Sequence, residues 1–191
     1  LGNLLGFGEI YLGLWGIPFT IFCVVGMINA FNMIDGLNGL CASLCLVCFV
    51  AIIYMINADT VPSLLPLILP VGAITGFLMY NLGVLGNQRT VFLGDNGSNA
   101  LGFMCAWILV YFSSVENSNF APVTALWFVA IPFFDAVGVM ASRAIKGIMP
   151  LRPGRDHLHH RLLDMGLSSN TIYLVLISIS ALFAATGYIF N

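Results

Sequence analysis

Near the end of the chain stands Ile172-Tyr-Leu-Val-Leu-Ile-Ser-Ile-Ser-Ala-Leu-Phe-Ala-Ala-Thr-Gly-Tyr-Ile-Phe190, a run without a charged residue. A helix that spans a membrane needs about 20 mostly apolar residues. A sheet in lipid must close into a barrel, whose strands are shorter and alternate in polarity. The run therefore predicts a spanning helix, with Ser168, Ser169 and Asn170 as candidate N-caps.

Five further apolar runs precede it, at residues 11–30, 40–56, 64–85, 98–112 and 123–141. The chain is 60% hydrophobic and 7% charged, whereas soluble domains are about 45–50% apolar and about 25% charged. We therefore predict an all-α, polytopic transmembrane helical bundle of about six spanning helices, with residues 1–191 forming one integral membrane domain. Gly72 and Gly76 suit close helix contact, within the chain by preference or between two copies in a homodimer.

The predicted crossings place the connecting segments alternately on two faces. One face receives all the cations, all the histidines and four aspartates: Arg89, Arg143, Lys146, Arg152, Arg155, Arg161, His157, His159, His160, Asp35, Asp95, Asp156 and Asp164. The other receives Glu9, Asp59 and Glu116. Because an excess of Lys and Arg marks the cytoplasmic side, we expect the polar chemistry there, in contact with the lipid bilayer and without a nucleic-acid partner.

Three cysteines, Cys41, Cys45 and Cys48, share one face of a predicted helix. They suggest either a metal or cluster site or a set of small buried apolar side chains. Buried cysteine usually behaves as a small hydrophobe, so we favour the second interpretation.

The first polar cluster is Asn29-Ala-Phe-Asn32-Met-Ile-Asp35-Gly-Leu-Asn38-Gly39, where the first run gives way to the second. Its polar residues recur at every third position, so a continued helix would place them roughly on one face. Such a set of oxygens suits a hard cation. Composition alone favours the other interpretation, a turn rich in Asn, Asp and Gly.

The second cluster is Phe92-Leu-Gly94-Asp95-Asn-Gly97-Ser98, directly before the fourth run. Gly97 and Ser98 are the start signal for its helix. The glycines allow close approach of a ligand to the backbone, a helix N-terminus offers N–H groups to an anion, and Asp95 can hold a divalent cation. The combination suits a metal-bound phosphate, and an N-capping turn is equally compatible with it.

The third cluster is Pro150-Leu-Arg152-Pro-Gly-Arg155-Asp-His157-Leu-His159-His160-Arg161, within a predicted cytoplasmic basic and His-rich loop at 143–170. The cations beside the histidines disfavour zinc, whereas arginine offers forked donors to phosphate oxygens. One interpretation is a basic patch against anionic lipid headgroups. Three histidines exceed what that patch needs, so we favour a site for phosphate or a sugar.

Asp135 stands within the fifth run, after Ile131-Pro132-Phe133-Phe134. A carboxylate in the hydrocarbon costs about 2.5–3.5 kcal/mol and usually faces a functional cavity. We expect Pro132 to kink the helix and open that cavity. The alternative places Asp135 near the boundary, where it reaches headgroup water.

Together the clusters offer oxygen ligands for a hard cation and Arg and His for phosphate at one membrane face. That inventory fits metal-assisted phosphoryl transfer between a soluble anionic substrate and one that enters from the bilayer. A divalent-cation transporter is the rival, supported by Asp135 and the histidines, although transporters place substrate residues near the midplane. A membrane scaffold would leave the Asp95 turn and the histidines without a role.

Four ordered stretches resemble the polyprenyl-phosphate N-acetylhexosamine-1-phosphate transferases: Asn29 to Gly39, Val91-Phe-Leu-Gly-Asp-Asn-Gly-Ser98, Ile131-Pro-Phe-Phe-Asp135 and Arg152-Pro-Gly-Arg-Asp-His-Leu-His-His160. Pro122-Val-Thr-Ala-Leu-Trp127 and the His-Leu-His-His form favour the undecaprenyl-phosphate GlcNAc-1-phosphate branch over the phospho-MurNAc-pentapeptide translocases. The resemblance implies that UDP-GlcNAc and undecaprenyl phosphate give undecaprenyl-pyrophosphoryl-GlcNAc and UMP at the bacterial inner membrane. The product would begin O-antigen, enterobacterial common antigen or a related surface polysaccharide.

The resemblance also implies roles for individual residues. Asn32 and Asp95 would hold Mg²⁺, with Mn²⁺ as the alternative ion. The implied catalytic set is Asp35, Asp95, His157, His159 and His160, and the implied substrate-binding set is Asn38, Phe92, Arg152, Arg155 and Asp135. Within these sets Phe92 would stack on uracil, Asn38 would lie near the uridine, and Asp135 would support the site from below.

The chain departs from the family pattern in three respects. The family has a tandem Asp pair upstream of the first cluster, and this chain has no Asp-Asp dipeptide. Members also have more than six helices, and many bacterial relatives carry Asp at the position of Asn38. We therefore expect a piece of a longer protein that is inactive alone. Robust UMP release by the isolated chain, with Mg²⁺, UDP-GlcNAc and a polyprenyl phosphate, would refute that expectation.

Overall fold

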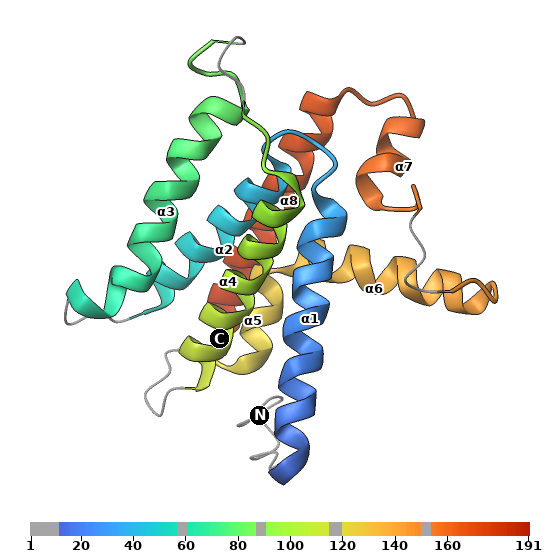
Figure 1. Cartoon of the computed structure of the whole chain (residues 1–191). Helices are drawn as coiled ribbons and strands as arrows, with labels where there is room; N and C mark the ends of the chain where they lie inside the picture. The colour runs from blue at the N-terminus through green and yellow to red at the C-terminus, as the bar shows by residue number, and fades with distance from the viewer. Residues whose placement is uncertain (1–11, 57–60, 87–90, 115–119, 150–153) are drawn as a thin grey trace.

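The computed structural model describes residues 12–56, 61–86, 91–114, 120–149 and 154–191, and within them the secondary structure is helical without a strand. The elements in order are η1 (Gly13–Trp15), α1 (Gly16–Ile34), α2 (Leu40–Met55), α3 (Val61–Asn81), α4 (Gly94–Ser114), α5 (Pro122–Phe128), α6 (Ala130–Ile145), α7 (Leu158–Asp164) and α8 (Ser169–Ile189). The all-α prediction is therefore confirmed, and the arrangement is a helical bundle with α7 at one end (Figure 1).

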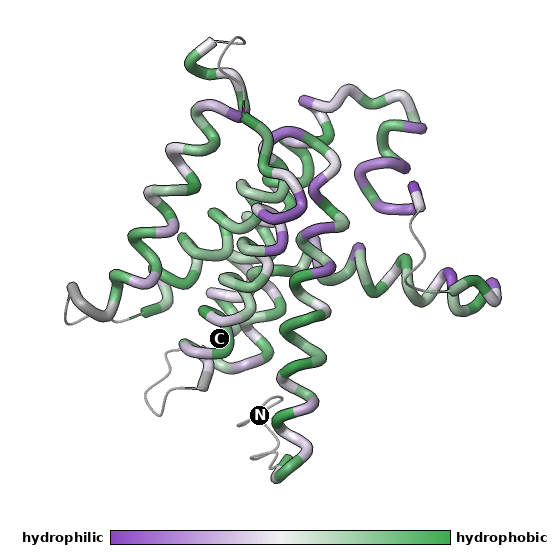
Figure 2. The backbone as a smooth tube through the Cα atoms, viewed as in Figure 1, coloured by the Kyte–Doolittle hydropathy of each residue, from purple (hydrophilic) through white to green (hydrophobic). Residues whose placement is uncertain are grey.

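Each predicted apolar run forms a helix, but fewer than six qualify as crossings. Among the described residues, three helical segments are long and apolar enough to span a membrane: Gly13–Ile34, Leu64–Asn81 and Ser169–Ile189. The bent pair α5 and α6 makes a fourth if it counts as one span, and Leu40–Met55 is shorter. Figure 2 shows the hydrophilic segments gathered mainly where α1 ends and α4 begins and around α7, whereas the helices of the bundle are mostly apolar.

The fifth run was expected to form one helix with a kink, and it forms two helices at 88° to each other. Pro132 supplies the reason, since a proline has no N–H to donate and its ring clashes with the carbonyl four residues earlier, here that of Phe128. The first helix ends at that residue, and the second begins at Ala130 with Pro132 in its first turn. The bend expected at Pro132 is therefore present, although it separates two helices at Val129 instead of kinking one, and α6 leaves the bundle sideways (Figure 1).

Helices α1 and α4 pack closely at Gly102. A Cβ at this glycine would lie 2.8 Å from the Cα of Ile28 and 3.1 Å from the Cβ of Phe31. Small residues allow helix backbones to approach in this way inside membranes. The crossing aligns the last turns of α1 with the first turns of α4, and so it brings the first two polar clusters together.

Two predictions about packing have opposite outcomes. Cys41, Cys45 and Cys48 are fully buried in the apolar core between the helices, as expected for small hydrophobes, and Cys45 Sγ lies 3.2 Å from Cys105 Sγ. Gly72 and Gly76, in contrast, have nothing within 4 Å of an added Cβ. The preferred interpretation, close packing of these glycines within the chain, is therefore wrong for the described residues.

Candidate functional site

The first two polar clusters meet at the α1–α4 crossing. Asn32 donates from Nδ2 to Ser98 Oγ over 2.9 Å, and its Nδ2 lies 3.5 Å from Asp95 Oδ1. Ser98 Oγ in turn donates to the backbone carbonyl of Asp95 over 3.1 Å. Helix α4 begins at Gly94, so Asp95 occupies its first turn, earlier than the start expected at Ser98. The site therefore combines a carboxylate, an amide and a helix N-terminus.

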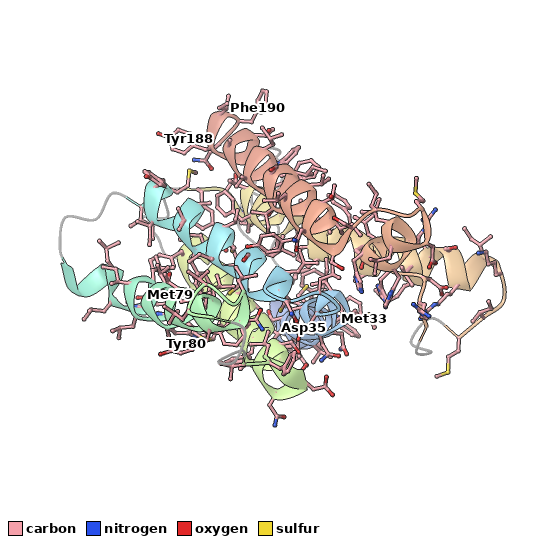
Figure 3. The ribbon with its side chains drawn as sticks, turned by 90° about the horizontal axis from the view of Figure 1, so that it is seen from above. Met33, Asp35, Met79, Tyr80, Tyr188 and Phe190 are labelled. Atoms are coloured by element: carbon pink, nitrogen blue, oxygen red, sulfur yellow. The ribbon has the colours of Figure 1, made fainter. Side chains whose placement is uncertain are left out.

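Asp35 joins this group from the turn that follows α1. Partial burial, and then the negative charge of Asp95, raise the pKa of Asp35 to about 6. A cation would offset the negative charge that Asp35 and Asp95 bring to this site. Seen from above, Asp35 lies at the end of α1, between α3 and the side occupied by α6 and α7 (Figure 3).

The third cluster reaches the same place through a contact between His159 and Gly36. A Cβ added at Gly36 would overlap the His159 ring, with Cδ2 at 2.7 Å and Cε1 at 2.9 Å. His159 is 1% exposed, and its Nδ1 and Nε2 have no hydrogen-bond partner among the described residues. Buried polar atoms in native proteins normally have one, so this ring offers two unused nitrogens directly beside the Asp35 turn.

Helix α6 holds the histidine segment by two contacts. The buried carboxylate of Asp135 lies 2.8 Å from His157 Nδ1 through Oδ2, and it accepts from the backbone N–H of Leu158 over 2.7 Å through Oδ1. Further along α6, buried Arg143 donates from Nε to Asp156 Oδ2 over 2.9 Å. The His157 and His159 rings lie parallel with centroids 6.3 Å apart. Asp135 therefore holds the histidine segment against α6, and the substrate-binding role that the family resemblance implies for it stays a prediction.

The structure does not bring every predicted residue into this group. Helix α1 ends at Ile34 and a turn follows, as the favoured interpretation of the first cluster had it, so the alternative of one continued helical face is wrong. Asn29 Nδ2 donates to the Val25 carbonyl of its own helix. Phe92 is 74% exposed, and Arg155 lines a cavity between α6 and α7 instead of contacting the carboxylates. Arg152 lies outside the described residues, as do Arg89, Glu9, Asp59 and Glu116.

Asn38 lines a polar pocket of about 370 Å³ between the α1–α2 turn, the end of α3 and the start of α8. Asn81 and Tyr173 line it as well. Asn81 is 4% exposed and donates to the Val91 carbonyl over 2.6 Å, while its Oδ1 has no partner. The pocket therefore offers amides and hydroxyls to a neutral polar group.

Sequence reasoning missed four residues that shape the site. From the sequence, Ser98 is predicted only as part of a helix start and Gly36 only as a turn residue. Arg143 is predicted only as a cation of the cytoplasmic face, and Asn81 lies within a predicted membrane span. For Asn81 the signal was an amide at the end of an apolar run, where a buried side chain needs a partner. For Gly36 no sequence signal existed, because its neighbour His159 lies on a distant segment.

Substituting Gly36 with alanine should impair the site more than the stability of the fold. The new Cβ would force the His159 ring out of its buried position, and overpacking of this kind typically costs about 1–3 kcal/mol. We expect a loss of at least about tenfold in activity from the displaced ring. Gly26→Ala is the matched control, because nothing lies within 4 Å of its added Cβ. Equal effects of the two variants on activity would contradict the contact.

Asp35 and His159 should give opposite pH dependences of stability. The pKa of Asp35 is raised from 3.8 to about 6, so its contribution to stability falls as the pH rises through that interval. The pKa of His159 is lowered from 6.5 to about 4, chiefly by burial, so its contribution falls as the pH drops through that interval. In the metal-free protein, as the pH increases from about 4 to 6.5, the melting temperature of the Asp35→Asn variant should rise relative to the wild type. Over the same interval, that of the His159→Gln variant should fall relative to the wild type. Parallel profiles in scanning fluorimetry with a chelator would refute the assignment.

The sequence is similar to a known family and to named relatives. The chain matches the model of the family described as Glycosyl transferase family 4 over residues 1–113. It is 39% identical over 188 residues to the undecaprenyl-phosphate alpha-N-acetylglucosaminyl 1-phosphate transferase of Escherichia coli strain K12, a match that covers 98% of this chain and 51% of that protein. Proteins of the same name from Yersinia pestis and Haemophilus influenzae are 37% and 38% identical, over 99% and 98% of this chain and 52% and 53% of theirs. The chain thus spans about half the length of the curated relatives it matches, and it belongs to glycosyl transferase family 4, as a membrane protein of transferase type.

Proposed function

We propose that this chain carries part of the active site of an enzyme that transfers GlcNAc-1-phosphate from UDP-GlcNAc to undecaprenyl phosphate. The products are undecaprenyl-pyrophosphoryl-GlcNAc and UMP. The names of the relatives support the lipid acceptor and the transferred sugar phosphate. The observation that carries the proposal is the meeting of Asp35 and Asp95 with His159 at the Gly36 turn.

The residues present fit Mg²⁺. Among the described residues no three His, Cys, Asp or Glu side chains form a metal-binding group. Mg²⁺ does not need one, because it commonly binds through one or two carboxylates, waters and substrate phosphates. Asp95 and Asp35, with the amide oxygen of Asn32, would hold it, and when bound it would neutralise charge on the diphosphate. Mn²⁺ prefers similar oxygen ligands.

The protein side chains would bind and orient the two phosphates. The N–H groups in the first turn of α4 favour an anion next to Asp95. The unused nitrogens of His159 offer a hydrogen bond to the sugar phosphate from the opposite side. The pKa of His159, lowered to about 4, keeps its ring neutral, so that one nitrogen donates and the other accepts. Arg155 and Arg152 remain predicted contacts of the sugar phosphate.

The nucleoside would lie beyond the metal site. Exposed Phe92 is available to stack on uracil, and the pocket at Asn38 offers amides to a polar base or ribose. We place the site at the cytoplasmic face of the bacterial inner membrane, because Arg143, Lys146, Arg155 and Arg161 lie around α6 and α7 and cations mark that side. The product would begin O-antigen, enterobacterial common antigen or another surface polysaccharide.

UMP release by the complete protein tests the proposal. With undecaprenyl phosphate and Mg²⁺, we expect turnover of UDP-GlcNAc and at least tenfold lower efficiency with UDP-MurNAc-pentapeptide. If another UDP-N-acetylhexosamine is the better donor, the assignment of GlcNAc would be wrong but the proposed type of reaction would stand. Metal uptake into vesicles without dependence on a UDP-sugar would favour the transporter instead. The structure gives that rival little support, since the Asp135 carboxylate is already engaged by His157 and Leu158.

A further inference from the structure

A second cavity lies between α6 and α7, on the side away from the carboxylates. It measures about 680 Å³, and Phe183 of α8 completes its wall. Its lining has two parts. Ile131, Phe134 and Val139 of α6 are apolar, whereas Lys146, Arg155 and Arg161 bring positive charge to its polar part. A lining divided in this way matches an amphiphile with an anionic headgroup, since the apolar part takes hydrocarbon and the cations take phosphate.

The carboxylates around the cavity leave that positive charge largely unopposed. Asp135 is bound to His157 and Leu158, and Asp156 is bound to Arg143. Asp164, at the end of α7, is the remaining acidic residue of the lining. Three cations therefore face one carboxylate that has no hydrogen bond or ion pair in the described structure.

The cavity shares Asp135 and Arg155 with the predicted site residues, but the residues proposed to hold the cation lie outside it. None of Asn32, Asp35 and Asp95 lines it, and neither does His159. Asp135 lines the cavity, and its carboxylate lies 2.8 Å from Nδ1 of buried His157. A phosphate in this cavity would not touch the carboxylates that face the proposed diphosphate, so the acceptor phosphate is not the expected occupant.

Helix α6 has two features of a helix that lies along a membrane surface. The helix runs at 88° to α5, across the direction of the long helices (Figure 1). It exposes Phe134 and Val137 along its length and Ile145 at its end, next to Lys146. Exposed apolar side chains beside cations are typical of helices that lie in the membrane interface, and basic pockets between helices on the cytoplasmic side bind acidic lipids.

We propose that the α6–α7 cavity binds the headgroup of an acidic glycerophospholipid, with Lys146 and Arg161 as phosphate contacts and an acyl chain along Phe134 and Val139. The bound lipid would stabilise the packing of α7, which carries His159, against α6. The proposal depends on the membrane setting alone and not on the proposed transfer reaction.

Native mass spectrometry of the complete, detergent-solubilised protein tests it without metal or nucleotide. The protein is titrated with palmitoyl-oleoyl phosphatidylglycerol and, separately, with the phosphatidylcholine of the same chains. We expect clear preference for phosphatidylglycerol and a roughly tenfold loss of its affinity in Lys146→Gln/Arg161→Gln, because each cation near the surface contributes to binding an anionic headgroup. Lys146→Arg/Arg161→Lys should retain it, and Asp164→Asn should strengthen it.

Three results would overturn the proposal. The first is equal binding of the two lipids, or equal phosphatidylglycerol binding by the wild type and the glutamine variant. The second is displacement of phosphatidylglycerol by equimolar undecaprenyl phosphate, which would make the cavity the acceptor site. The third is displacement by millimolar inorganic phosphate, which would make it a simple anion site.

If the double variant fails to fold by circular dichroism, the single variant Lys146→Gln, at an exposed residue, should still weaken phosphatidylglycerol binding severalfold. Unchanged binding by this variant would be decisive against the site.

Discussion

Replacing Asp95 with asparagine should reduce UMP release by the complete protein roughly a thousandfold, a loss of the size seen when a preorganised electrostatic contact to the transition state is removed. Asp95 lies in the first turn of α4, with Asn32 and Ser98 as neighbours, and burial and then its negative charge raise the pKa of Asp35. The substitution keeps the size of the side chain but removes a charge that the proposed cation needs. Steady-state UMP release at saturating UDP-GlcNAc and Mg²⁺ measures the effect.

Two controls separate this loss from a folding defect. Asn96→Ala changes an exposed residue in the same turn and should leave turnover within about twofold, since surface substitutions away from special features have small effects. Asp35→Asn should also reduce turnover, and its combination with Asp95→Asn should add little, because residues that act as a unit are non-additive. Near-normal activity of Asp95→Asn would remove this residue from the metal site and, with it, the main support for the mechanism.

Much of the site was accessible from the sequence because its residues follow local rules. Asn32 near the end of one helix and Asp95 at the start of another are polar groups at apolar boundaries, and alternating crossings bring such boundaries to one face. The structure confirms that they meet, at 3.5 Å. The interpretation of the first cluster as one helical face is wrong because α1 ends at Ile34. The residues that follow form a turn, which their Asn and Gly content favours.

The rest depends on tertiary contacts that leave no local pattern. Mean hydropathy over a window does not register the break at Val129, so the run at 123–141 is predicted as a single helix, although the structure has two helices at 88° with Pro132 in the first turn of the second. From the sequence, lipid headgroups and a sugar phosphate are alternative ligands for the whole basic loop. The structure distributes its residues over two sides of α7, with His159 toward Gly36 and Arg161 toward the second cavity.

The Asp135 carboxylate joins α6 to the segment that carries the histidines. Asp135 should act as a positioning residue, and Asp135→Asn should lower kcat by roughly 10–100-fold with little change in KM, as is typical when the partner of a functional histidine is altered. The carboxylate accepts from Leu158 N–H through one oxygen, and its other oxygen lies 2.8 Å from His157 Nδ1, a geometry that favours the proton on Nδ1. An asparagine that keeps the Leu158 contact presents its NH₂ group to His157, which then must accept at Nδ1 and carry its proton on Nε2.

The tautomer of His157 provides a readout that a merely structural role would not change. In the selectively ¹⁵N-histidine-labelled protein, NMR should report the Nδ1–H form in the wild type and the Nε2–H form in Asp135→Asn. Asp156→Asn is the matched control, because it weakens the other contact between α6 and this segment, the bond to Arg143 at 2.9 Å, without touching His157. It should lower thermal stability but retain the Nδ1–H form. If Asp135→Asn kept both the wild-type tautomer and the wild-type kcat, the contact would only anchor α7, and the orientation of the histidines would have to come from the burial of His159 against Gly36.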